Sequence, residues 1–217
     1  MEPVTRKETL LARVRVALHR QADVEIPAPG REPDRSGPGT AAERLARFRE
    51  RFEAVGGIVL AAPSPEAALP ALGETLRMEG ITALLFPADD ETAVRLGEAL
   101  VPLGPFRVAS GEEIRRPDPP PTAGIQTAEF AIAETGTIVQ TSRGGKTLLP
   151  GLLTDIHVAL VPAGIVRETP EECLRELSED PPRNLSFITG PSRTADIELA
   201  LTIGVHGPRG VIAILLP

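Results

Sequence analysis

The chain has 217 residues, of which 41% are hydrophobic, and its formal net charge is -7. This length and composition predict one large domain, with or without a small arm, whose core needs no covalent cross-links. The negative charge argues against nucleic acid as a partner, because nucleic-acid-binding proteins usually present a basic face.

The sequence contains a single cysteine, Cys173. One cysteine permits no intrachain disulfide and cannot by itself hold an iron–sulfur cluster or a structural zinc ion. The N-terminus lacks the apolar core of a signal peptide, and no run approaches the roughly 18 apolar residues of a membrane span. We therefore expect a soluble, cytoplasmic protein with no metal or cofactor bound by this chain.

The first 39 residues are predicted to form an N-terminal arm. A capping-box pattern at residues 5–8 predicts a helix that ends near Arg20, and the Pro/Gly-rich segment 21–39 predicts a linker. The helix has an apolar stripe, which we expect to pack either on the body of the protein or on a neighbouring subunit. Residues 40–217 are then the α/β domain.

Helices and short apolar strands alternate through the first half of this domain. Predicted helices cover residues 40–55, 64–78 and 90–100, and predicted strands cover residues 58–62, 81–86 and 106–109. Such alternation predicts a parallel sheet that is covered on both faces. Ligands of these sheets usually lie beyond the carboxyl ends of the strands.

Residues 129–133 and 136–142 are β-rich runs that flank Glu134 and Thr135, and they predict a hairpin in which Gly136 permits the bend. We expect a carboxylate at a bend between buried strands to be desolvated. Desolvation would raise its proton affinity and suit Glu134 to act as a general acid, base or nucleophile. The alternative is that Glu134 only bonds local backbone N–H groups.

The loop from Ser142 to Thr147 ends like a phosphate-binding P-loop. That motif requires a glycine at position 140, where the chain has Gln140, so a nucleotide hydrolase is excluded. Lys146 is one of only two lysines beside 21 arginines. It is a candidate contact for an anionic ligand, with a solvated loop lysine as the alternative.

A strand over residues 155–162, which contains His157, and a helix over residues 168–177 are predicted next. Residues 211–216 predict a final strand. We expect His157 to be satisfied structurally, whereas His206 lies in a glycine-flanked helix stop and is a candidate for acid–base chemistry. No short histidine spacing supports a metal site.

The stretch between the predicted helix at 168–177 and the final strand predicts a strand at 185–189, a turn at Gly190-Pro191 and a helix to Val205. Ser192 or Thr194 would be the N-cap of that helix. The helix N-terminus and Arg193 would together form a site for a carboxylate or phosphate. In the alternative reading, the turn and cap are only structural, and Arg193 pairs with Asp196 or Glu198.

Three motifs in the second half of the sequence are more specific for a protein family than the separate turn, cap and strand signals within them. They are AIAETGTIV at 131–139, GPSRTADIE at 190–198 and GVHGP at 204–208. They resemble the LUD family, in its lactate-utilisation protein C type. The resemblance implies the fold of sugar-phosphate isomerases and coenzyme A transferases. This fold is a three-layer αβα sandwich with a mostly parallel sheet, which agrees with the pattern above.

The resemblance also implies a role in the oxidation of L-lactate to pyruvate, beside companions that carry iron–sulfur clusters. This chain has neither cluster ligands nor a G-x-G-x-x-G turn. We therefore expect a non-redox subunit, with the iron–sulfur clusters on partner subunits. The alternatives are a stand-alone isomerase or coenzyme A transferase-like enzyme, which would use Glu134 as base or nucleophile, and a purely structural scaffold.

In the leading hypothesis the hairpin bend, the turn that follows residue 189 and the segment 204–207 form a small-anion pocket. Arg193 would pair with the carboxylate, and Glu134 or His206 would handle a proton. The remaining candidate substrate-binding residues are Thr135, Gly136, Thr137, Lys146, Gly190, Ser192, Thr194 and Asp196.

Overall fold

The computed structural model describes residues 39–195, 201–203 and 207–217. The arm and linker predicted at residues 1–39 therefore lie almost wholly outside the described residues. Within the described part, no helix combines the length and the apolar character needed to cross a bilayer.

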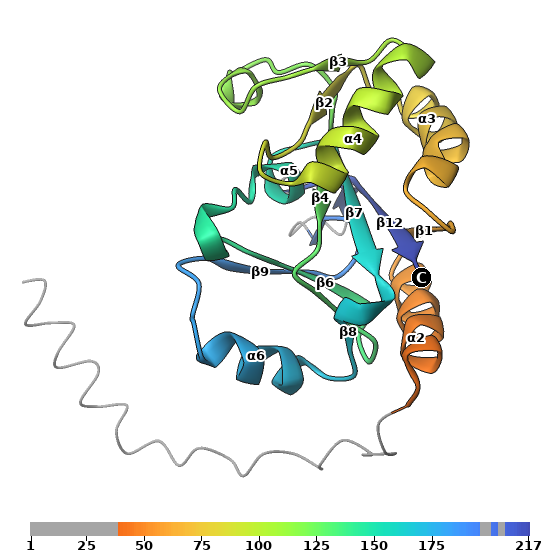
Figure 1. The fold of residues 1–217 in the computed structure, drawn as a ribbon. Coiled ribbons are helices and arrows are strands. Elements are labelled where there is room, and N and C mark those ends of the chain that lie inside the picture. The colour runs from red at the N-terminus through yellow and green to blue at the C-terminus, as the bar shows by residue number, and fades with distance from the viewer. Residues whose placement is uncertain (1–38, 196–200, 204–206) are drawn as a thin grey trace, which may run out of the picture. The chain divides into compact units, whose positions relative to one another are not determined.

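A six-stranded sheet forms the centre of the domain (Figure 1). All five pairings between neighbouring strands are parallel, which confirms the predicted α/β class with a mostly parallel sheet. In sheet order the strands are β1 (Ile58–Ala61), β12 (Gly210–Leu216), β7 (Ile156–Pro162), β4 (Thr122–Thr127), β2 (Ala83–Leu85) and β3 (Arg107–Val108).

Strand β4 was not predicted from the sequence, although it lies inside the sheet between β7 and β2. Its sequence, TAGIQT, is largely polar and follows a cluster of prolines. Five of its six residues are nevertheless buried. Neighbouring strands, rather than its own hydrophobicity, therefore fix β4 in the interior.

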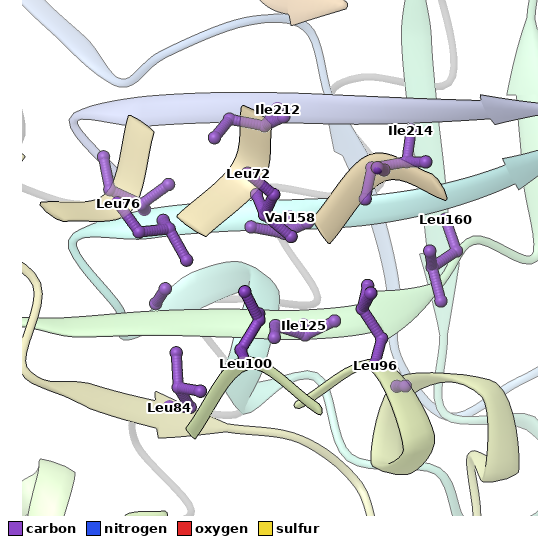
Figure 2. Close-up of a cluster of buried hydrophobic side chains, with 14 of the residues drawn as sticks. Leu72, Leu76, Leu84, Leu96, Leu100, Ile125, Val158, Leu160, Ile212 and Ile214 are labelled. Carbon is purple, nitrogen blue, oxygen red and sulfur yellow. The ribbon is translucent and has the colours of Figure 1, made fainter. Parts of the chain in front are cut away.

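Helices α3 (Leu69–Met78) and α4 (Glu91–Leu100) cover one face of the sheet. Asp90 is the N-cap of α4, as predicted, and a 3-10 turn at Glu66–Ala68 precedes α3. Figure 2 shows leucines of both helices lying against the strand side chains Ile125, Val158 and Ile212. This packing is the largest of the hydrophobic clusters among the described residues.

The opposite face carries helix α2 (Ala41–Ala54) together with a second, four-stranded sheet. The predicted capping box at Thr40 and Glu43 is confirmed. Phe48 and Phe52 of α2 stack on each other and contact residues from both sheets. In order, the second sheet contains β8 (Val166–Arg167), β5 (Phe130–Ile132), β6 (Thr137–Thr141) and β9 (Leu185–Ile188).

The predicted hairpin is confirmed as β5 and β6, which pair antiparallel. Its growth into a sheet was not predicted, because the pairing of β8 and β9 with the free hairpin edges depends on contacts between distant residues. Helix α6 (Pro170–Ser178) packs Cys173 and Leu177 on the outer side of this sheet. One face of the main sheet therefore carries a helix and a sheet rather than helices alone.

Several short elements connect these layers. Helix α5 (Leu149–Leu152) contacts β4 and β7. The remaining 3-10 turns are Val101–Leu103, Glu113–Arg115, Arg143–Gly145 and Ala163–Ile165.

The helix predicted to run to Val205 is wrong where the structure describes the chain. Strands β10 (Arg193–Ala195) and β11 (Leu201–Ile203) pair antiparallel instead. Ser192 precedes a strand and Thr194 lies within one, so neither begins a helix. Thr194, Thr202 and Ile203 are β-branched residues, which favour extended backbone, and this preference outweighs the apolar run that suggested a helix.

Candidate functional site

The hairpin bend between β5 and β6 meets the end of β9. The hydroxyl oxygens of Thr135 and Thr137 lie 2.7 Å apart, and those of Thr137 and Thr189 lie 2.8 Å apart. This chain of hydroxyl groups places the first motif beside Thr189, the residue immediately before the second motif. We call this region, formed by residues 134–137 and 189–193, the motif junction.

The motif junction lies against the C-terminal end of α2. A Cβ atom at Gly136 would be 2.3 Å from the backbone nitrogen of Phe52, and one at Gly190 would be 2.7 Å from the carbonyl oxygen of Val55. Arg193 Nη2 donates a hydrogen bond of 2.8 Å to the same Val55 carbonyl. A cation at this position complements the negative end of the helix dipole. Arg193 therefore stabilises α2 in addition to any contact with a ligand.

Glu134 is exposed at the hairpin bend, and its backbone N–H donates to the carbonyl of Glu168 over 3.0 Å. The desolvation predicted for its carboxylate is therefore wrong, because the strands on either side are buried while the bend itself reaches solvent. A catalytic role for Glu134 stays a prediction.

The turn that contains Ser192 lies beside the segment after β11. The backbone N–H of Ser192 donates to the carbonyl of Pro208 over 2.8 Å, and a Cβ atom at Gly207 would be 3.4 Å from the Cβ of Ser192. Asp196 and His206, both candidate site residues, lie outside the described residues. Their roles stay predictions.

Lys146 lies away from the motif junction. Thr137 and Thr141 are the two ends of β6 and lie about 13 Å apart along the strand, and the loop with Lys146 follows the end that is away from the hairpin bend. Lys146 is exposed, and its Nζ is 3.1 Å from Glu129 Oε2. The predicted set of site residues is therefore divided between two places.

Lys146 contributes to a cavity of about 230 Å³ at the carboxyl ends of β2 and β4. From β2 the chain continues toward β3 at one edge of the sheet, and from β4 it continues toward β7 on the other side. The connections therefore run in opposite directions from these two neighbouring strands. Ligands of open α/β sheets usually bind at the point where the connections diverge in this way. The lining residues are Pro87, Asp89, Asp90, Glu91, Gln126, Thr127, Gln140, Thr141, Lys146 and Thr147.

Asp90 joins the two sides of this cavity. Its carboxylate accepts hydrogen bonds from the backbone N–H of Ala93 at 3.0 Å and of Thr127 at 2.6 Å, and from the Thr127 hydroxyl at 3.0 Å. The start of α4 is thereby tied to the end of β4. Both oxygens of the Asp90 carboxylate therefore already accept hydrogen bonds from the protein itself.

Two glutamines that are not among the predicted site residues also line the cavity. Gln126 is 3% exposed and Gln140 is 5% exposed. Among the described residues, neither Nε2 atom has a hydrogen-bond partner. The signal available in the sequence was Gln140 inside the predicted β-rich run 136–142, since buried polar groups without partners are uncommon. Gln126 gave no such signal, because β4 was not predicted.

His157 is completely buried in β7, and neither ring nitrogen has a hydrogen-bond partner within the described part of the chain. The predicted structural satisfaction is therefore not found there. Burial lowers the pKa of His157 from its ordinary value of 6.5 to about 4. Its Cε1 and the Nε2 of Gln126 lie 3.5 and 3.1 Å from the Cβ position of Gly151.

Known proteins match this chain over most of its length. The LUD domain family model matches residues 45–216. Lactate utilization protein C of Geobacillus thermodenitrificans is 30% identical over 178 residues, which cover 78% of this chain and 67% of that protein. Lactate utilization protein C of Halalkalibacterium halodurans is 38% identical over 91 residues, 39% of this chain and 40% of that protein.

A solved structure supports the fold. The crystal structure of a DUF162 family protein from Deinococcus radiodurans superposes with a TM-score of 0.56 at 21% identity, covering 83% of this chain and all of that chain. Because the family model matches well over half of the sequence, this protein belongs to the LUD domain family.

Proposed function

We propose that this protein acts in lactate utilisation, as a non-redox subunit of an iron–sulfur complex that oxidises L-lactate to pyruvate. The observation that carries this proposal is the family match, together with the relatives named lactate utilization protein C. The matched stretches span 40% and 67% of the two relatives described above, so activity, substrate and partners belong to the proposal.

The absence of a redox role rests on the chemistry of this chain's one cysteine. A cluster needs several thiolate ligands, and the sequence supplies only Cys173. Cys173 is buried, and burial raises the pKa of its thiol to about 12. A protonated, enclosed thiol is a poor metal ligand. Electrons from lactate would therefore travel through clusters on partner subunits.

The motif junction is the proposed place for the substrate carboxylate. A guanidinium has five N–H donors, and the structure assigns one nitrogen of Arg193 to the Val55 carbonyl. Its exposed side chain would bind the carboxylate, with Ser192 and Thr194 as further donors. Glu134, exposed on the adjacent bend, or His206 would accept the proton of the lactate hydroxyl.

Gentle anaerobic purification of the tagged protein, from its own cells grown on lactate, tests this function. We expect a brown complex in which the iron–sulfur absorbance bleaches when L-lactate is added. Cells grown without lactate and purified identically are the control. A colourless single species, under conditions where candidate companions are expressed and stable, would contradict the subunit role and favour an enzyme that acts alone.

A further inference from the structure

We propose that the cavity at the ends of β2 and β4 binds a small zwitterion that carries one ammonium and one carboxylate group, the chemistry of a free amino acid. This site is separate from the motif junction, which lies at the other end of β6. It therefore adds a second ligand to the proposed function and does not depend on lactate oxidation.

The buried glutamines supply the carboxylate side of the site. Leaving an amide N–H buried without an acceptor is unfavourable, and this occurs at both Gln126 and Gln140 among the described residues. Both Nε2 atoms are enclosed, and that of Gln126 lies 3.1 Å from the Cβ position of Gly151, outside the cavity lining. A half-turn of a terminal amide exchanges its nitrogen and oxygen at almost unchanged shape, and in the proposed complex this half-turn would present the N–H₂ group to the ligand. Carboxylate oxygens are suitable acceptors for these N–H₂ groups. The ammonium of Lys146 also lines the cavity, but its charge is shared with Glu129.

The ammonium side is supplied by acidic residues at the start of α4. Asp90 is engaged by the fold, which leaves the exposed carboxylates of Asp89 and Glu91 on the cavity lining. The three carboxylates outnumber the ammonium of Lys146, which is already paired with Glu129. This balance repels a free anion such as phosphate and favours a ligand that brings its own positive charge.

The volume of the cavity and the types of residue that line it restrict the class of ligand further. The cavity of about 230 Å³ is smaller than the roughly 300 Å³ at which pockets for drug-sized molecules begin. Its described lining contains no aromatic side chain, so it offers no stacking surface for a sugar ring or a nucleobase. A short amino acid meets both conditions.

Calorimetry on the full chain carrying Arg193→Ala, which removes the proposed carboxylate contact at the motif junction, tests this proposal with L-alanine, L-lactate and propionate. These compounds share three carbons and a carboxylate, and differ at the second carbon by an ammonium, a hydroxyl or a hydrogen. We expect L-alanine to bind at least about tenfold more tightly than L-lactate or propionate at this cavity. Glycine and L-serine extend the series. If no amino acid of the series binds, or if propionate binds as well as L-alanine, the proposal is wrong.

Two substitutions assign any binding to the cavity. Asp89→Asn should weaken L-alanine binding about tenfold, whereas Asp118→Asn, the same charge change at an exposed residue outside the lining, should not alter it. Gln140→Met should weaken binding and also raise the Tm of the ligand-free protein by a few degrees, because it removes a buried unpaired amide. Unchanged binding in both Asp89→Asn and Gln140→Met would overturn the assignment.

Discussion

At the level of single residues, the protonation of the buried His157 makes the stability of the protein depend on pH. Because burial lowers the pKa of His157 to about 4, its imidazole stays neutral in the folded state down to that pH. In the unfolded chain the same imidazole is protonated below its ordinary pKa of 6.5. The unfolded state therefore binds more protons between these values, and the free energy of unfolding should fall by up to about 3 kcal/mol as pH drops from 6.5 to 4. Replacing His157 with Leu should flatten this part of the Tm-against-pH curve. Parallel curves for the two proteins would contradict the prediction.

Gly136 is the residue at which backbone shape and packing are both decisive. Its φ is 64°, and an added methyl group would meet the backbone of α2. Gly136→Ala should therefore lower the free energy of unfolding by about 3 kcal/mol, measured by urea denaturation. Gly144→Ala is a matched control, because Gly144 has φ 67° but no neighbouring atom within 4 Å of its Cβ position. That control should cost only about 1 kcal/mol, and equal losses would exclude the contact with α2 as the cause.

At the scale of elements, α2 is held at both ends by side chains. Thr40 and Glu43 form its capping box, and Arg193 bonds the carbonyl of Val55 at its C-terminal end. The capping box was predictable, because its residues are three apart in the sequence. The contact with Arg193 was not, because 138 residues separate the partners. Local signals therefore identified α2 but not what holds its second end.

Arg193→Ala separates the structural and ligand roles of this contact. Loss of the bond to α2 should reduce the free energy of unfolding by about 1 kcal/mol. If Arg193 also pairs with a carboxylate, L-lactate affinity should fall by about 2 kcal/mol, measured by calorimetry. Arg175→Ala is the control, because within the described chain the exposed Arg175 side chain has no hydrogen bond or ion pair. Full lactate affinity in stably folded Arg193→Ala would remove Arg193 from the site.

At the scale of the whole molecule, sequence pattern predicted the class of the fold better than its assembly. Apolar runs and capping residues indicated strands of the main sheet and the helices that cover it. Strand β4 escaped prediction because neighbours rather than apolar residues bury it, and β10 and β11 escaped because an apolar run suggested a helix. The candidate site was predicted in part. The motif junction unites short motifs, whereas the cavity exists only because distant strands β2 and β4 are adjacent.

The position of β12 has a consequence for folding. It lies between β1 and β7 in the sheet, and its pairing with β1 joins Ile58 to Ile212, 154 positions later in the sequence. Among the described residues β1 has no other strand partner, so this edge of the sheet forms only through a contact of very high sequence separation. Chains truncated before Gly210 should therefore expose the apolar edges of β1 and β7 to chaperones and proteases.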